Sequence, residues 1–305
     1  MLSVLPMKKN IQILCCLIFF LLPFFSVGQI PTENALLWEI SGKGLQKSSF
    51  LYGTIHVVCP NDLGFSEEAK KAFNVSEQLY LELDLDDPEL AIKMQRSMAS
   101  QTHLRNLLKA NEYEQLESFF RERTGYSIES LGMIKPFYLL SYTYSPMIGC
   151  NQPISVEKGL AEMAYIQNKN IFGLETLEDQ LSVFEKISQQ KQANILLSCV
   201  KDFSKMQESF QALLKDYKEE NLNALVKTSF DSYSARYEHL LLDRRNKRWL
   251  KKITKISAKK STFFAVGAAH LAGEKGVINL LRKKGYTVTA VMNQTPANSL
   301  IVSTK

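Results

Sequence analysis

Two segments far apart in the chain share one pattern, an apolar strand-like run followed by a glycine and, three residues later, a histidine. Gly53 precedes His56 in this way, and Gly267 precedes His270. The chain has four histidines and 14 glycines among 305 residues, so two such spacings arise by chance on the order of a few per cent of the time. In open α/β sheets, ligands bind in the crevice beyond the carboxyl ends of the strands. The pattern therefore predicts that both ends of the chain bring an imidazole to one crevice.

Each histidine also has a plainer interpretation as a hydrogen-bonded loop side chain, which we favour for any single histidine. Imidazole is, however, the commonest metal ligand and a general base near neutral pH. A glycine at the end of a strand allows a sharp turn of the backbone, which we expect to aim His56 and His270 into the crevice. The same context at both places favours a functional site.

The first 28 residues (1–28) have the pattern of a secretory signal peptide. Two lysines precede an apolar stretch over residues 11–27, and the small residues Ser26 and Gly28 come before a cleavage point at Gln29. The stretch is short and no stop-transfer pattern follows it. We therefore expect export, to the periplasm or out of the cell, with no stable membrane span after cleavage. An uncleaved membrane anchor is the alternative.

The charge balance argues against a nucleic-acid partner. The whole chain has a formal net charge of +6, and losing the two leader lysines, with no acidic residue, lowers it to +4. Proteins that bind nucleic acid cluster cations to neutralise several phosphates, whereas the basic residues of 244–252 sit among apolar ones at helical spacing. The composition is that of an ordinary globular protein, and it indicates no oligomeric state.

Three cysteines remain after the predicted cleavage, namely Cys59, Cys150 and Cys199. Export permits disulfides, but an odd count leaves at least one thiol unpaired within the chain. A Cys59–Cys150 disulfide is one interpretation, since both residues lie in predicted loops. Three small buried hydrophobic side chains are the other. No Cys-x-x-Cys motif occurs, which argues against a thiolate zinc site and against thioredoxin-like chemistry.

Hydrophobic patterns place strands at both ends of the mature chain and helices between them. The expected strands cover residues 36–41, 48–55, 78–85, 169–173, 261–266 and 286–292. The expected fold is α/β, a mixed central sheet formed by both ends of the mature chain, with a large helical insertion over roughly residues 87–260. No linker marks a boundary, so we expect residues 29–305 to form one domain.

Local signals refine this outline. We expect a hairpin turn through Gly42-Lys43-Gly44, helix N-caps at Ser66, Asp87 and Thr176, and a helix end at Gly285. The helix over residues 156–168 would turn Ile166 inward. If the last two strands run parallel, the helix between them makes a right-handed crossover.

A site with two imidazoles also needs carboxylates. Glu82 shares one strand face with Asp84, so both point either to solvent or into a site. Glu157 lies in the first turn of a helix, where the helix dipole alone would favour a carboxylate. Glu175 follows the strand over residues 169–173, the same topological place as the histidines, and is the acid that best fits the site.

One cation also fits such a site. Arg245, followed by Asn246, lies in a predicted helix with Leu241, Leu242 and Trp249. A guanidinium there could bind a carboxylate or a developing oxyanion. It could equally be a surface charge.

Taken together, these segments resemble the TraB/GumN family, which is related to the Tiki metalloproteases and more distantly to the erythromycin-esterase and ChaN-like proteins. The resemblance covers nearly all of the mature chain. It rests on residues 51–56, 80–84, 173–176 with Gln180, 241–246, and 265–271 with Gly273 and 285–286. The chain departs from the family at Ser155-Val156-Glu157, where Gly-Val-Asp is common.

The resemblance implies a metal-dependent hydrolase fold with a divalent ion, Mn or Co rather than a structural Zn. Mixed imidazole and carboxylate ligands suit Mn, Fe, Co or Zn, and in the Tiki branch the activity is cleavage of peptide bonds. On this basis we expect an exported metallopeptidase acting on a peptide or small-molecule substrate. The expected metal-holding residues are His56, Glu82 and His270.

The expected catalytic residues are Glu175 or Glu157, which would take a proton from water and return it to the leaving group, and Arg245, which would stabilise the oxyanion. A second hypothesis is a binding protein on the same scaffold that captures a peptide or haem without turning it over. A third is an interaction module whose function resides in the helical middle.

Overall fold

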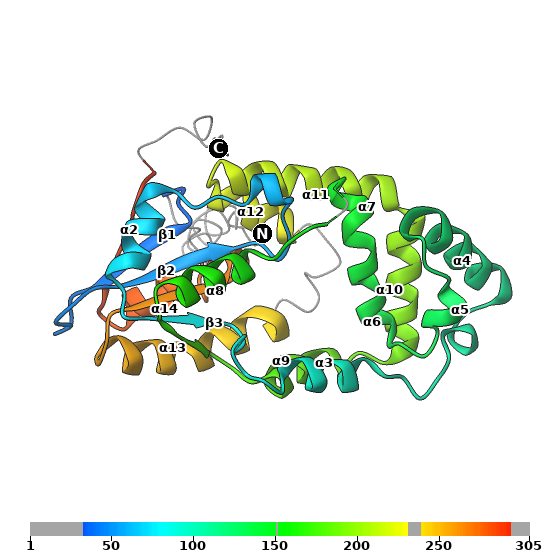
Figure 1. The fold of residues 1–305 in the computed structure, drawn as a ribbon, viewed down its shortest axis with the longest axis horizontal. Coiled ribbons are helices and arrows are strands. Elements are labelled where there is room, and N and C mark those ends of the chain that lie inside the picture. Colours follow the sequence, from blue (N-terminus) through cyan, green and yellow to red (C-terminus); the bar gives the residue numbers. More distant parts are fainter. Residues whose placement is uncertain (1–32, 151, 231–238, 294–305) are drawn as a thin grey trace, which may run out of the picture.

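The computed structural model describes residues 33–150, 152–230 and 239–293, and the structural statements below concern these residues. The predicted signal peptide lies outside them. A β-sheet occupies one end of the molecule and a group of helices occupies the other (Figure 1). Within the described ranges, no helix combines the length and the apolar character needed to cross a membrane.

Six strands form one mixed sheet in the order β4-β3-β5-β2-β1-β6. They are β1 (Leu37–Ser41), β2 (Ser49–Thr54), β3 (Gln78–Leu81), β4 (Asn170–Gly173), β5 (Thr262–Gly267) and β6 (Thr287–Ala290). Strand β1 runs antiparallel to both of its neighbours, while β2, β3, β4 and β5 are mutually parallel. The expected α/β fold with a mixed sheet built from both ends of the chain is confirmed.

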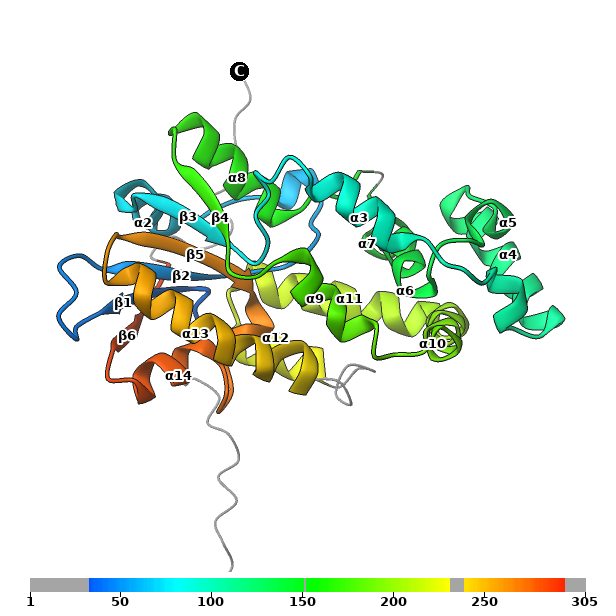
Figure 2. The same cartoon turned by 90° about the horizontal axis from the view of Figure 1, so that it is seen from below.

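Strand β5 is the most deeply buried strand because helices cover both faces of the sheet. Phe263, Phe264, Ala265 and Val266 have no exposed surface, as expected for an apolar run in a parallel sheet. In the view of Figure 2, α2 (Glu67–Val75) and α8 (Val156–Ile166) lie above the sheet, with α13 (Arg244–Ser257) and α14 (Val277–Lys283) below it.

Strands β2 and β5 lie side by side in a register that brings the two Gly-x-x-His motifs together. Gly53 pairs with Val266, and Thr54 pairs with Gly267. Both strands therefore end at the same level of the same edge of the sheet. The prediction that segments from opposite ends of the chain meet there is confirmed.

The remaining helices fill the middle of the chain. They are α3 (Leu90–Met98), α4 (Ala110–Thr124), α5 (Ile128–Leu131), α6 (Pro136–Leu139), α7 (Tyr144–Ile148), α9 (Leu177–Phe184), α10 (Gln189–Lys201), α11 (Phe203–Lys218) and α12 (Leu222–Phe230). Helices α4, α5, α6 and α10 surround a second hydrophobic cluster that includes Leu116, Phe120 and Leu196. Between α8 and α9 the chain returns to the sheet as the edge strand β4.

Several local predictions are confirmed. The hairpin turns through Gly42, Lys43 and Gly44, all with positive φ. The Ser66 hydroxyl accepts from the backbone N–H of Ala69 at 3.2 Å and caps α2. Thr176 and Asp179 form a reciprocal capping box at α9, and Gly285, with φ 87°, follows α14. Strand β6 runs in the same direction as β5, so α14 is a parallel crossover that passes over β2 and β1.

Three local predictions are wrong. Strand β3 ends at Leu81, so Glu82 and Asp84 do not share a strand face, and the Asp84 carboxylate accepts instead from the backbone N–H of Asp86 in a turn. Asp87 does not cap a helix, because its carboxylate accepts from the N–H of Glu89 and closes its own turn. Ile166 is 82% exposed, because with 3.6 residues per turn it lies on the side of α8 away from the buried Leu160 and Ala164.

The cysteines follow the first of the two interpretations. Cys59 and Cys150 form a disulfide with Cα atoms 6.0 Å apart, a normal separation for such a bond. Cys199 is a buried free thiol. The crosslink joins the loop that follows β2 to the segment that precedes α8.

Candidate active site

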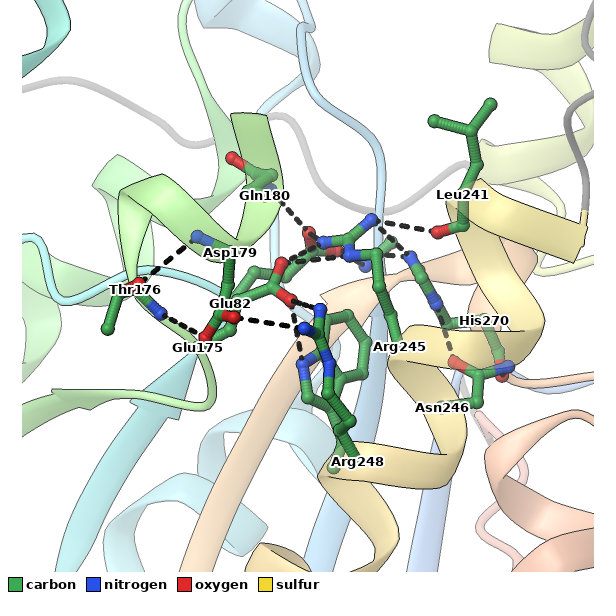
Figure 3. Close-up of polar contacts among 12 residues, drawn as sticks. Glu82, Glu175, Thr176, Asp179, Gln180, Leu241, Arg245, Asn246, Arg248 and His270 are labelled. Carbon is green, nitrogen blue, oxygen red and sulfur yellow. Dashed lines mark hydrogen bonds and ion pairs between the residues drawn. The ribbon is translucent and has the colours of Figure 1, made fainter. Parts of the chain in front are cut away.

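A buried polar cluster lies beyond the carboxyl ends of β3, β4 and β5, where α13 crosses the edge of the sheet (Figure 3). Glu82 comes directly after β3, Glu175 after β4, and His270 after β5. Helix α13 contributes Arg245 and Asn246, which face these strand ends. Four elements separated by up to 188 residues of sequence thus supply one cluster, and each of these residues is at most 7% exposed.

Arg245 occupies the centre of the cluster. Its Nε and Nη2 donate to Glu175 Oε1 at 2.8 and 2.5 Å, and Nη2 also donates to Glu82. Its Nη1 donates to the backbone carbonyl of Leu241 at 3.1 Å and lies 3.2 Å from His270 Nε2. A guanidinium has five N–H groups, so these five contacts use all of them. Arg245 has no donor left for a developing oxyanion in this arrangement.

Glu175 is fully engaged by its neighbours. Oε1 receives the two bonds from Arg245, while Oε2 lies 3.3 Å from both Arg248 Nη2 and Trp249 Nε1. Burial raises the pKa of this carboxyl above its usual value, and the pull of Arg245 in the opposite direction does not cancel that effect. Glu175 therefore acts as the buried counter-ion of Arg245 and presents no free oxygen.

Glu82 is ionised in spite of its burial. Oε1 accepts from the backbone N–H of Gly267 at 2.8 Å, and Oε2 accepts from Gln180 at 3.1 Å. Burial raises the pKa of Glu82, but His270 and Arg245 outweigh it and bring the pKa to about 2. Arg245 is the cause that persists at neutral pH, because His270 is then itself uncharged.

Asn246 fixes the tautomer of His270. The Asn246 amide nitrogen donates to the carbonyl of Lys275 at 3.0 Å, so its oxygen is the atom that lies 2.6 Å from His270 Nδ1. Nδ1 must therefore carry the proton, and Nε2 presents its lone pair 3.7 Å from Glu82 Oε1. Burial lowers the pKa of His270 to about 3 despite the nearby Glu82, so the ring is neutral at physiological pH.

His56 belongs to a second pair at the end of β2. Its side chain is 72% exposed, and Nδ1 lies 3.8 Å from Glu157 Oε1. Glu157 accepts from the hydroxyl of Thr54 at 2.7 Å and from that of Ser155 at 2.8 Å. His56 is near enough to the buried cluster to lower the pKa of both Glu82 and His270. The two histidines thus follow adjacent parallel strands, and each lies near a carboxylate from another element.

The donor chemistry of these pairs fits a divalent ion. His270 is neutral, its Nε2 lone pair is oriented by an acceptor on Nδ1, and Glu82 is ionised, which are the states in which these groups bind metal. The described residues nevertheless contain no ready-made group of three His, Cys, Asp or Glu side chains for an ion. Arg245 Nη1 lies against Nε2 of His270, and His56 remains at the exposed pair.

The two motif glycines serve close packing rather than a sharp turn. Both lie inside their strands and neither has a positive φ, so the expected turn is wrong. A Cβ at Gly53 would lie 2.9 Å from Leu271 Cδ1 and 3.2 Å from Ala268 Cβ. A Cβ at Gly267 would lie 3.3 Å from Glu82 Oε1. The absence of a side chain at Gly53 makes room for Ala268 and Leu271 of the second motif. The absence of a side chain at Gly267 makes room for the Glu82 carboxylate.

Substitution of Gly53 tests this packing role. Gly53→Ala is expected to lower the free energy of unfolding by about 1–3 kcal/mol, the usual cost of overpacking a core. Urea denaturation of the mature chain measures this change. An unchanged midpoint would show that the second motif has room to move away from the strand.

Acid should weaken the metal-free protein through His270. The unfolded side chain takes up a proton below its ordinary pKa of 6.5, whereas the folded one does so only near 3. Stability from this group is therefore complete above pH 6.5 and is lost as the pH falls toward 3. The expected slope is about 1.4 kcal/mol per pH unit. Urea unfolding of chelator-treated protein at several pH values measures it, and His270→Gln should flatten the slope by that amount.

A cavity of about 250 Å³ opens beside α9, lined by Phe137, Tyr138, Leu181 and Phe184 among others. The rings of Phe137 and Phe184 stack there with centroids 3.9 Å apart. Pockets that enclose drug-sized ligands hold about 300–1,000 Å³, so this cavity is small for haem. Leu181 directly follows Gln180, which links the cavity wall to Glu82.

The structure assigns contacts to three residues whose part in the site the sequence did not indicate. Asn246 orients His270, Gln180 donates to Glu82, and Trp249 donates to Glu175 and lies with its ring centroid 4.4 Å from that of His270. Residues at i and i+1 of a helix normally face apart. Arg245 and Asn246 are both buried because α13 is covered by the sheet on one side and by the segment after β5 on the other.

Comparisons with known proteins extend the picture. The sequence is 24% identical to an uncharacterized protein of Treponema pallidum, an alignment that covers 92% of this chain and 93% of the relative. It is also 24% identical to Metalloprotease TIKI2 of Xenopus tropicalis and to Metalloprotease TIKI1 of Danio rerio, over 89% and 84% of this chain. The alignments span 62% and 63% of the lengths of these two proteins. No solved structure matches.

The family assignment rests on a match that runs through both Gly-x-x-His motifs and all six strands. The profile of the TraB/PrgY/gumN family matches residues 36–290. That range begins just before β1, ends with β6, and includes every residue of the buried cluster. This chain belongs to the TraB/PrgY/gumN family.

Proposed function

We propose that this protein is an exported metal-dependent hydrolase of the peptidase type, with its reacting centre at the carboxyl ends of β2, β3 and β5. One observation carries the proposal. His56 and His270 follow the adjacent parallel strands β2 and β5, and each lies near a carboxylate, His270 3.7 Å from Glu82 and His56 3.8 Å from Glu157. The metalloprotease names of two distant relatives support the peptidase class, and the leader-like first residues support export.

His56, His270 and Glu82 are the residues that would hold a divalent ion, with Mn, Co or Zn compatible with these ligands. Such an ion supplies a Lewis acid for the scissile carbonyl and lowers the pKa of water. Asn246 contributes by keeping the proton on Nδ1 of His270, which leaves the lone pair on Nε2. An ion would reach this lone pair when Arg245 Nη1, now 3.2 Å away, moves aside. Glu82 is kept ionised by Arg245.

Among the described carboxylates at the site, Glu157 is the one best suited to moving a proton. Its side chain is 14% exposed, beside the open His56, and its oxygens accept from the hydroxyls of Thr54 and Ser155, which can rotate away. In the proposed reaction Glu157 accepts a proton from the attacking water and returns it to the leaving amine. Glu175 is the less suitable of the two predicted acids, because four N–H groups already occupy its oxygens.

Arg245 has a positioning role in this proposal. It holds Glu82 and Glu175 together and contacts His270, so it sets the position of three side chains at once. The predicted oxyanion role would require Nη1 to release Leu241 or His270 when substrate binds.

The test uses the chain that begins at Gln29. The protein is stripped of metal, supplied with Mn²⁺, Co²⁺ or Zn²⁺, and assayed for bound metal and for cleavage of a peptide library. We expect one ion per chain and metal-dependent cleavage, both lost in His56→Ala and His270→Ala. His103→Ala is the matched control, because His103 caps a helical turn away from the sheet. Cleavage that survives both site substitutions would overturn the metal mechanism.

The same experiment distinguishes the alternative, a protein that binds a peptide or haem without cleaving it. That function predicts saturable binding that depends on His56 and His270, with no cleavage in the presence of any of the three ions. For haem, the readout is a Soret band that the two substitutions remove.

A further inference from the structure

The His56–Glu157 pair depends on two segments that are far apart in sequence. His56 follows β2, and Glu157 lies in the first turn of α8. His56 is 72% exposed and its contact with Glu157, at 3.8 Å, is longer than a hydrogen bond. An exposed pair of this kind is too weak to fix its own geometry. The Thr54 hydroxyl holds Glu157 at 2.7 Å, but Thr54 lies before His56, so the loop that carries His56 depends on other contacts.

A clamp beside the pair holds these segments. Val58 and Ile154 exchange two backbone hydrogen bonds of 2.9 and 2.8 Å, which form an isolated antiparallel bridge. The Cys59–Cys150 disulfide lies next to this bridge and crosslinks positions 91 residues apart. Val58 is two residues after His56, and Ile154 is three residues before Glu157.

One end of the clamp rests on a long helix. Gln211 of α11 donates to the carbonyls of Met147 and Ile148 at 2.9 and 3.1 Å, just before Cys150. Ser145 donates to the carbonyl of Cys150 itself at 2.9 Å. The cysteine on the helical side is therefore fixed, and the disulfide transmits that position to the loop that carries His56.

We infer that the Cys59–Cys150 disulfide positions His56 against Glu157, so that the proposed site is complete only while this disulfide is intact. The inference rests on the proposed function for its catalytic consequence, but not for its structural one. The Thr54–Glu157 hydrogen bond ties the end of β2 to α8. Without the crosslink, the loop after His56 would be held to the segment before α8 by noncovalent contacts such as the Val58–Ile154 bridge. The conformational entropy that a crosslink over 91 residues removes would then oppose this closure. The buried Glu82–His270 cluster has its own contacts and should not need the clamp.

The test compares Cys59→Ser/Cys150→Ser with the wild type in the chain from Gln29. The control is Cys199→Ser, which changes a buried cysteine outside the clamp. Amide hydrogen exchange is the primary readout. In the double variant the Val58 and Ile154 amides should lose protection while those of Phe264 and Val266 in β5 keep it.

The functional readouts follow from the same geometry. The affinity for Mn²⁺ or Co²⁺ should fall about 10- to 100-fold, as when supporting groups around a metal site are removed. The kcat of peptide cleavage should fall more than KM rises, because the clamp positions reacting groups rather than substrate. Cys199→Ser should change neither quantity.

Reduction of the wild type provides a second route that does not require the variant to fold. A dithiol reductant transfers two electrons and two protons to the disulfide, giving two cysteine thiols and the cyclic disulfide of the reductant. Tryptophan fluorescence checks that the fold persists, since Trp38 and Trp249 are buried in the main core. The treatment should reproduce the double variant, and it should have no effect on the double variant itself.

The outcomes separate this inference from the proposed function. Unchanged protection of Val58 and Ile154, in both the double variant and the reduced wild type, would overturn the inference. Loss of that protection, in a protein that neither binds metal nor cleaves peptides when oxidised, would uphold the positioning role and refute the proposed hydrolase instead.

Discussion

Replacing Arg245 by methionine should lower the free energy of unfolding by about 3–5 kcal/mol, the usual cost of removing one partner from a buried ion pair. The Glu82 and Glu175 side chains are only 9% and 2% exposed, and both share the same guanidinium group. Methionine keeps most of the volume of the side chain. It leaves two buried carboxylates close together without a cation between them, so their like charges repel. Urea denaturation at pH 7 measures the loss.

The chain provides a matched control for this prediction. Arg248 also contacts Glu175, but its side chain is 46% exposed, so water screens the interaction. Arg248→Met should cost less than about 1 kcal/mol. The cost of Arg245→Met should shrink when Glu82→Gln and Glu175→Gln are added, because no uncompensated charge then remains. Equal costs for the two arginines would show that burial does not govern the cluster.

Replacing His270 by alanine should reduce the proposed hydrolysis by about 10²–10⁴-fold, the range for loss of a positioned catalytic group. His270 is the buried imidazole whose Nε2 faces Glu82. Asn246→Ala should have a smaller effect, about 10- to 100-fold. It leaves the imidazole in place and removes only the acceptor that keeps the proton on Nδ1. The measurements are kcat/KM and bound metal per chain.

This experiment must distinguish a variant that fails to fold from one that folds but does not cleave. His270→Gln retains a polar side chain of similar length, and thermal unfolding reports whether it folds. If folded His270→Gln cleaves peptides as fast as the wild type, the imidazole has no part in the chemistry. If Asn246→Ala impairs cleavage as much as His270→Ala does, the amide does more than orient the ring.

The sequence predicted the frame of this site because that frame depends on local signals. Apolar runs such as residues 263–266 predict strands, and helix caps such as Thr176 depend on residues within one helical turn. The two Gly-x-x-His motifs could be matched to each other because each is a strand end, and parallel strands end at a common edge. The Cys59–Cys150 pair was one of two open interpretations, suggested by the position of both residues in predicted loops, and the structure decided between them.

The predictions were wrong where a short segment made local hydrogen bonds other than the expected ones. Asp87 was predicted to cap a helix, but its carboxylate closes a turn at Glu89, and the helix begins later. Strand β3 was extended beyond Leu81 because residues 82–85 continue the alternation. In the fold the chain bends there, which sends Glu82 into the buried cluster and Asp84 into a turn.

By itself, the sequence determined the α/β class, the meeting of the chain ends in one sheet, and the edge at which His56 and His270 emerge, since these follow from periodicity and strand direction. Only the tertiary structure decided what the charged side chains do there. Arg245 meets Glu175 and Glu82 across 70 and 163 residues, and no local pattern encodes such a contact. Desolvation keeps His270 neutral and Arg245 keeps Glu82 ionised, so the pKa values of these groups are set only when the fold brings the side chains together.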